Sequence, residues 1–368
     1  MKNGMSWIKV LSVNIFVLLG LLITAEVGSR IAWTAYQCYY RACDFSRMLN
    51  LKIFDSGSTE KNIGLSTYNE FLGYIPTAAF SAIINTDGWQ NVLVTIDRNG
   101  FRSNGNNSTD LNKKSLILTV GDSFTFGDQV SDTETWPSCI ELKTNQETLN
   151  AGVFGYGTAQ AVRRASFVTR RQNIETVILS VLVNNDFHRD RLRFRSGFPR
   201  PAVIRSEQGL SYADVPPIDS SGTNWQPNGE SAILSNFSHY SYLLTKVIPV
   251  IGIDVTGMRR TETHENAADL GQVIHFAVRE FSNLDATNKF IVLQYSQTDF
   301  PNLQPEVVQL KEQLLSEARL ESIPVIDTYN RLQLELSNNS NDIWNSHHTA
   351  YGNALVCDEI YQVIHSYQ

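Results

Sequence analysis

The stretch Leu116–Pro137, which reads LILTVGDSFTFGDQVSDTETWP, decides the fold. An apolar run ends abruptly at Gly121, Asp122 and Ser123, and a polar segment follows. A short run that is apolar on both faces is typical of a buried strand in a parallel sheet. Ser123 would then follow the carboxyl end of a strand, where α/β proteins bind their ligands. The alternative is a turn or helix cap without a chemical role.

Further runs of the same kind alternate with helical patterns along the chain. The apolar runs cover residues 115–120, 147–153, 176–183, 289–296 and 323–328. Helical patterns lie near residues 134–145, 158–171, 266–282, 305–320 and 350–366. Strands that alternate with helices favour parallel pairing, with helices on both faces of the sheet. The sequence therefore predicts an α/β, doubly wound sandwich with a five-stranded parallel sheet.

The N-terminus predicts a membrane anchor at residues 1–30. Lys2 and Lys9 precede the mainly apolar run Val10–Ala25, and Trp7 and Trp33 flank it. A basic start followed by an apolar run is typical of a signal peptide or signal anchor, and tryptophans favour the membrane interface. No clear small-residue cleavage site follows. We therefore expect an uncleaved transmembrane helix, with the rest of the chain outside the cytoplasm (periplasm or cell surface).

The rest of the chain divides into an extension, a main domain and an insertion. Residues 31–110 form a turn-rich N-terminal extension, and residues 111–368 form the main domain. A Pro- and Gly-containing insertion covers about residues 195–262, and its segment AVIRSEQGLSYADV predicts a hairpin. A connection of this length is either a flap over the strand ends or a surface excursion with no part in binding.

Charge and cysteine content exclude some functions. The 368 residues carry a net charge of −7, which argues against a general nucleic-acid binder. The cysteines lack metal-site spacing. Cys38 with Cys43, or Cys139 with Cys357, could form a disulfide in an oxidising compartment, and unpaired thiols are the alternative.

Ser123 needs a base before it can act as a nucleophile. His347 and His348 lie just before the last predicted helix, in a loop that follows the last strand. Asp342 is a nearby carboxylate that could orient the imidazole and stabilise its cation. The alternative is a polar loop with helix-capping residues.

Two other strand ends offer donors for an oxyanion. Gly155 follows the second strand, and a glycine lets a backbone N–H approach a ligand closely. Asn185 follows the third strand and could donate its side-chain amide. A glycine-rich turn and a helix cap are the respective alternatives.

Taken together, these segments resemble the SGNH (GDSL-type) hydrolases, in particular membrane-anchored or exported bacterial members. The match runs from about Leu116 to Ile364, without the insertion. By resemblance, Ser123 is the nucleophile. Its own N–H, the N–H of Gly155 and the amide of Asn185 form the oxyanion hole.

The resemblance also makes His347 the general base and then the general acid. His347 fits better than His348 because Gly352 follows it at the family's spacing. The family usually has Asp three residues before this histidine, where the chain has Trp344. Either Asp342 still reaches His347, or the site is a Ser-His dyad. The departure also leaves room for an inactive member.

The resemblance implies a membrane-tethered, extracytoplasmic serine esterase without metal or organic cofactor. Its partners would be the membrane and an acylated carbohydrate or small ester, from which it removes acyl groups such as acetyl. Two alternatives stay open. An O-acyltransferase on a cell-surface glycan would use the same site, and a catalytically inactive protein would only bind glycan.

Four arginines, Arg189, Arg191, Arg193 and Arg195, alternate directly after Asn185. In extended form they would share one face and could attract an anionic substrate, such as an acidic glycan or a lipid phosphate. The alternative is a solvated edge with ion pairs to nearby aspartates.

Overall fold

The computed structural model describes residues 65–86, 88–105, 116–195, 198–217, 262–338 and 342–367, together with positions 17, 20, 21, 24, 25, 27 and 28. The predicted anchor at residues 1–30 therefore lies almost wholly outside the described residues, as does most of the insertion. Within the part of the chain that is described, no helix is both long and apolar enough to cross a membrane.

The chain divides into two compact units. One comprises residues 1–63 and 223–260, and the other comprises residues 64–222 and 261–368. Nearly all of the first unit lies outside the described residues. The second unit contains the α/β sheet and every residue that the sequence analysis assigns to the site.

A five-stranded parallel sheet forms the centre of the second unit and confirms the predicted fold class. The strands are β5 (Leu116–Val120), β6 (Glu147–Asn150), β7 (Thr176–Leu182), β13 (Asn288–Gln294) and β14 (Val325–Asp327). Their order is β14-β13-β7-β5-β6, and neighbouring strands are parallel. The order reverses between β5 and β7, so this pair flanks the switch point where such folds bind ligands.

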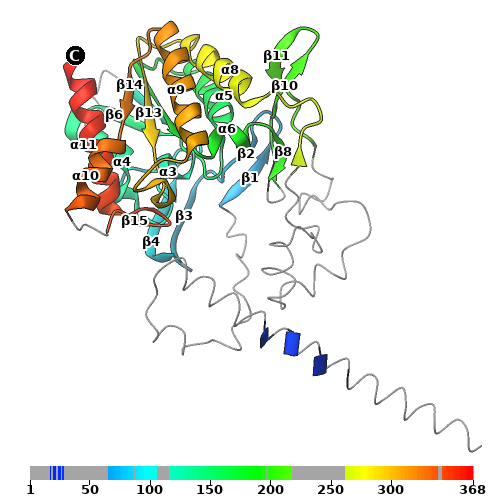
Figure 1. Ribbon diagram of the computed structural model, residues 1–368. Helices are drawn as coiled ribbons and strands as arrows, with labels where there is room; N and C mark the ends of the chain where they lie inside the picture. Colours follow the sequence, from blue (N-terminus) through cyan, green and yellow to red (C-terminus); the bar gives the residue numbers. More distant parts are fainter. Residues whose placement is uncertain are drawn as a thin grey trace, which may run out of the picture. The chain divides into compact units, whose positions relative to one another are not determined.

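Helices cover both faces of the sheet (Figure 1). The covering helices are α4 (Trp136–Thr144), α5 (Thr158–Thr169), α8 (Leu270–Ser282), α9 (Pro305–Leu320) and α11 (Ala350–Ser366). Alternate strand residues face opposite layers. Ile117 and Ile178 pack with α4 and α11, whereas Leu118 and Leu179 pack with α5, α8 and α9.

Smaller elements surround the sheet. The extension contributes β1 (Ser66–Asn69), β2 (Gly73–Pro76), β3 (Phe80–Thr86) and β4 (Trp89–Ile96). Outside it lie β8 (Leu192–Arg195), β9 (Phe198–Pro199), β10 (Val203–Ser206), β11 (Gly209–Tyr212), β12 (Glu262–Thr263), β15 (Trp344–Asn345) and β16 (His347–His348). Short helical segments are α3 (Ser123–Phe126), η1 (Asp132–Glu134), α6 (Asp186–Arg189) and η4 (Gln297–Asp299). The pairing of β10 with β11 confirms the predicted hairpin.

Among the described helices longer than one turn, α10 (Tyr329–Ser337), which directly follows β14, was not predicted. Its only fully buried residue is Leu332. A helix that buries so little has no broad apolar stripe, and the stripe is the signal by which a surface helix is found in a sequence.

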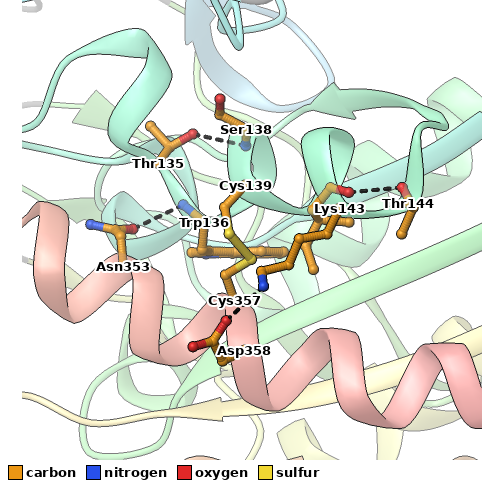
Figure 2. Close-up of a disulfide and its surroundings, with 10 residues drawn as sticks. Thr135, Trp136, Ser138, Cys139, Lys143, Thr144, Asn353, Cys357 and Asp358 are labelled. Atoms are coloured by element: carbon orange, nitrogen blue, oxygen red, sulfur yellow. Dashed lines mark hydrogen bonds and ion pairs between the residues drawn. A yellow bond between two sulfur atoms is a disulfide. The ribbon is translucent and has the colours of Figure 1, made fainter.

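Cys139 on α4 and Cys357 on α11 form a disulfide, with a Cα–Cα distance of 6.1 Å (Figure 2). Two further contacts join the same helices. The backbone N–H of Trp136 donates to Asn353 Oδ1 at 3.1 Å, and Lys143 pairs with Asp358 at 3.1 Å. Because α4 follows the Ser123 segment and α11 follows His347, these contacts link the two segments of the predicted site. Cys38 and Cys43 lie outside the described residues.

Candidate active site

Ser123 is the first residue of α3 and follows β5 by three positions. The side chain of Asp122 accepts the N–H of Phe124 at 2.9 Å, which caps this short turn. Gly121 allows the turn to approach β7, because a Cβ here would lie 2.3 Å from Thr125 Oγ1 and 2.9 Å from the backbone oxygen of Ser180. The turn therefore holds Ser123, a residue that is 5% exposed, at the carboxyl end of the sheet.

His347 lies beside Ser123, although 224 positions separate them in the sequence. His347 Nε2 is 2.9 Å from Ser123 Oγ, which is hydrogen-bond distance. The ring is carried by the small β15–β16 hairpin, and the backbone N–H of His347 donates to Gln129 Oε1 at 3.2 Å. The structure thus brings together a hydroxyl and a base that can take its proton.

His348 does not share this role. It is 2% exposed and packs edge-to-face on Phe124. Burial, and then the charge of His347, lower the pKa of His348 to about 3. An imidazole with this pKa stays neutral at ordinary pH and cannot hold a proton during turnover. The geometry therefore favours His347, as the spacing to Gly352 does.

Asp342, predicted to orient the imidazole, is not brought to it. Its side chain is exposed, and its backbone oxygen accepts a hydrogen bond from the hydroxyl of Thr349. Among the described residues, neither a hydrogen bond nor an ion pair joins Asp342 to His347. Trp344 occupies the position where the family has its acid, and its Nε1 donates to the backbone oxygen of Tyr295 at 3.1 Å.

A different carboxylate lies next to the imidazole. Asp128 Oδ2 is 3.8 Å from His347 Nε2, and the Asp128 side chain is 15% exposed. Burial raises the pKa of Asp128 to about 6, although the charges of His347 and Arg102 oppose this shift. Asp128 is still mainly ionised at neutral pH. It can therefore stabilise the imidazolium that forms when Ser123 gives up its proton.

Arg189 links the segments that carry Ser123, Gly155 and Asn185. Its Nη1 donates to Asp122 Oδ2 at 2.8 Å, to Asp186 Oδ1 at 2.6 Å and to the backbone oxygen of Tyr156 at 3.0 Å. These partners are the immediate neighbours of Ser123, Asn185 and Gly155, respectively. One buried guanidinium nitrogen thus gathers three strand ends at one point.

Gly155 adopts φ +73°, in the left-handed region that favours glycine. A Cβ there would lie 3.1 Å from the hydroxyl of Tyr74 and 3.3 Å from Nη1 of Arg195. The same Tyr74 hydroxyl donates to the backbone oxygen of Phe154 at 2.9 Å. Since a trans peptide directs its C=O and N–H to opposite sides, Tyr74 orients the N–H of Gly155.

Asn185 caps the short helix α6 at the end of β7, the strand next to β5. Its side chain is exposed, and its amide donates to Asn184 Oδ1 at 3.0 Å. In the described structure this amide makes no hydrogen bond to Ser123. Its role as an oxyanion donor stays a prediction, as does that of the Gly155 N–H.

Sequence reasoning missed Asp128, Tyr74 and the linking role of Arg189. Asp128 stands only five residues after Ser123, in the stretch that decided the fold. A carboxylate in the loop after the nucleophile was thus a usable signal once Trp344 was found at the acid's usual position. Tyr74 belongs to β2 of the extension, and its sequence carries no sign of the long-range contact.

No protein-family model matches the chain, and no curated protein does either. Solved structures are similar, and one is a member of the lipolytic protein G-D-S-L family from Veillonella parvula. It shares 15% identity at a TM-score of 0.40, with 68% of this chain and 97% of that chain covered. The family name of this similar structure is the one that the sequence resemblance predicts.

Two further similar structures are esterases. An acetyl xylan esterase from Geobacillus stearothermophilus shares 11% identity at a TM-score of 0.39, over 68% of this chain and 95% of that one. The esterase EstA from a Pseudoalteromonas species shares 12% at 0.38, over 69% and 98%. At such identities the similarity concerns the fold alone.

Proposed function

We propose that the protein is a serine hydrolase that cleaves ester bonds through an acyl-enzyme. The 2.9 Å contact between His347 Nε2 and Ser123 Oγ carries this proposal. A hydroxyl paired with an imidazole at the switch point of a parallel sheet is an arrangement for nucleophilic acyl transfer.

The reaction has two halves. His347 takes the proton of Ser123 as Oγ attacks the ester carbonyl, and the resulting imidazolium then protonates the departing alcohol. Water attacks the acyl-enzyme in the second half, with His347 again accepting and returning a proton. In both halves Asp128, 3.8 Å from Nε2, stabilises the cationic ring. The Gly155 N–H and the Asn185 amide would bind the oxyanion.

The substrate class rests on the sequence resemblance. It implies acyl groups, such as acetyl, on a carbohydrate or another small ester. An acyltransferase would use the same residues and differ only in its acceptor. Adding a glycan acceptor to the hydrolysis assay and searching for acylated glycan distinguishes transfer from hydrolysis.

Ester hydrolysis by the full chain, compared with Ser123→Ala and His347→Ala, tests the proposal. We expect each variant to lose at least about 10⁴-fold in kcat, because removing either member of such a unit abolishes its function. A fluorophosphonate probe should label the wild type and not Ser123→Ala. A folded wild type that is neither labelled nor active would instead favour the inactive, glycan-binding alternative.

We also propose that the protein is tethered to a membrane with its catalytic domain outside the cytoplasm. The basic and then apolar start of the chain supports this location. The Cys139–Cys357 disulfide also supports it, because such bonds persist in oxidising compartments. Carbonate extraction should leave the protein in the membrane fraction, and external protease should reach its domain. Protein recovered in the soluble cytoplasmic fraction would contradict the proposal.

A further inference from the structure

The structure separates the four arginines that follow Asn185. Arg189 is in α6 and forms ion pairs with Asp122 and Asp186. It therefore does not belong to an extended segment that presents all four arginines on one face. The predicted ion pair with Asp186 is therefore present. Asp190 behaves differently, because its carboxylate accepts the backbone N–H groups of Ala159 and Gln160.

The other three arginines differ in their partners. Arg191 Nε donates to the backbone oxygen of Ala268 at 2.9 Å. Arg193 on β8 is exposed, and its guanidinium lies over the ring of Phe194. Arg195, also on β8, contacts Gly155, which is predicted to bind the oxyanion. Its Nη1 lies 3.4 Å from the backbone oxygen of Gly155.

Arg195 is half-buried. In the described part of the chain, no carboxylate lies within ion-pair distance of it. The pKa of Arg195 is lowered to about 10, by burial and by the nearby charges of Arg189 and Arg200. Arg200 is 2% exposed and donates to the same Gly155 oxygen at 2.9 Å. Of these three guanidinium groups, Arg189 alone forms ion pairs with carboxylates of the described residues.

This positive charge lies close to the nucleophile. Arg189 Nη1 contacts both Asp122, the neighbour of Ser123, and Tyr156, the neighbour of Gly155. Arg195 contacts the backbone oxygen of Gly155, and Arg189 contacts the backbone oxygen of the next residue, Tyr156. The two arginines therefore contact adjacent peptides. Arg195 is thus partly exposed beside Gly155, the residue predicted to bind the oxyanion of a bound ester.

We propose that Arg195 binds a negatively charged group of the substrate, so that the preferred substrate is an ester carrying a carboxylate or phosphate near the scissile bond. This inference rests on the proposed function, because it places the reacting carbonyl between Ser123 and Gly155. An unpaired, half-buried guanidinium gains a charge-assisted hydrogen bond from such a group. A neutral ester leaves it unpaired, so discrimination follows directly from the site.

Two matched pairs of esters test the proposal and locate the charge. Para-acetoxybenzoate and its methyl ester differ in charge on the alcohol side, and para-nitrophenyl hemisuccinate and butyrate differ on the acyl side. For at least one pair, the wild type should prefer the anionic ester in kcat/KM, relative to uncatalysed hydrolysis. In Arg195→Gln that preference should fall about tenfold or more, the usual worth of a hydrogen bond to a charged group.

Arg193→Gln is the matched control, because it removes the same charge from an exposed position on the same strand. It should keep the wild-type preference. Equal use of both esters by the wild type, or a preference that survives in Arg195→Gln, would overturn the inference. So would an equal loss in both arginine variants, which would indicate only a long-range effect of net charge.

A binding measurement separates this inference from the proposed function. Calorimetry on full-length Ser123→Ala should show tighter binding of the anionic member of at least one pair, and the added Arg195→Gln change should abolish the difference. If the wild type hydrolyses no ester but this difference is found, the proposed function fails and the anion site stands. Equal affinity for both members of each pair would remove the anion site even in an active enzyme.

Discussion

The serine segment and the histidine segment of the site are held in place by different means. Around Ser123, Asp122 caps the turn and is itself bound by the buried Arg189. Arg102 fixes the loop beyond, through the backbone oxygen of Phe126. His347 lies in a hairpin whose two strands, β15 and β16, have two residues each. Its Nδ1 has no hydrogen-bond partner among the described residues.

The difference shows that the two segments contribute unequally to the site. In the familiar triad, a carboxylate on Nδ1 orients the ring. Here the carboxylate is Asp128, which comes from the serine segment and faces Nε2, the nitrogen that also faces Ser123. The serine segment thus supplies the nucleophile and the stabilising charge, whereas the histidine segment supplies only the ring.

Arg189→Met should have the largest effect on this arrangement. It removes the cation between Asp122 and Asp186 and leaves two buried carboxylates uncompensated. We expect a loss of about 3–5 kcal/mol in the free energy of unfolding, measured by urea denaturation. The rate of fluorophosphonate labelling should fall by about 100-fold, because a small misplacement of reacting groups can cost that much.

Arg189→Lys separates position from charge. It keeps the cation, but the lysine side chain is shorter, so its ammonium nitrogen does not reach the position from which Arg189 Nη1 contacts all three oxygens. Labelling should remain at least about tenfold slower under conditions where this variant is fully folded by circular dichroism. Wild-type labelling in folded Arg189→Lys would show that Arg189 contributes charge alone and does not position the nucleophile.

Asp128→Asn should have the next largest effect on activity, a fall in kcat of about 10- to 100-fold. This corresponds to about 1.4–2.8 kcal/mol of lost stabilisation of the imidazolium. Asp342→Asn is the matched control and should change kcat by less than about twofold, because its side chain is exposed and away from the ring. The opposite ranking of the two variants would return the acid role to Asp342.

The stability of the same variant supplies a second readout. The folded state raises the pKa of Asp128 from 3.8 to about 6, so between these values it keeps a proton that the unfolded chain releases. Stability contributed by this group is therefore lost as pH rises from about 4 to 6, by up to about 3 kcal/mol. The difference in unfolding free energy between wild type and Asp128→Asn should fall by this amount between pH 4 and pH 7. A difference independent of pH would contradict the raised pKa.

Tyr74→Phe should have the smallest effect, a fall in kcat of about three- to tenfold with little change in KM. It removes only the hydroxyl that holds the Phe154–Gly155 peptide. If that peptide donates its N–H to an oxyanion, the loss appears in the transition state and not in substrate binding. Tyr68→Phe, which removes a tyrosine hydroxyl from β1 of the same extension, should leave both parameters unchanged. A shift in KM alone for Tyr74→Phe would argue against a role in oxyanion binding.

The sheet could be predicted because its signals are local. Runs such as Thr176–Leu182 are buried along their whole length, and α9 and α11 begin and end where their periodicity does. Ser123 and His347 were found by their positions outside strand ends. Asp128 and Tyr74 depend on contacts between distant segments, and no periodicity encodes such contacts. Asp342 was chosen for its nearness to His347 in sequence, which a hairpin does not convert into nearness in space.

The Cys139–Cys357 bond closes a ring of chain with a sequence separation of 218, and the whole insertion lies inside that ring. A protease that cut the insertion would therefore produce two fragments that stay covalently joined, one carrying Ser123 and the other His347. Joined fragments meet at a high effective concentration, whatever the dilution. A nicked molecule would thus keep both Ser123 and His347 in one covalent unit.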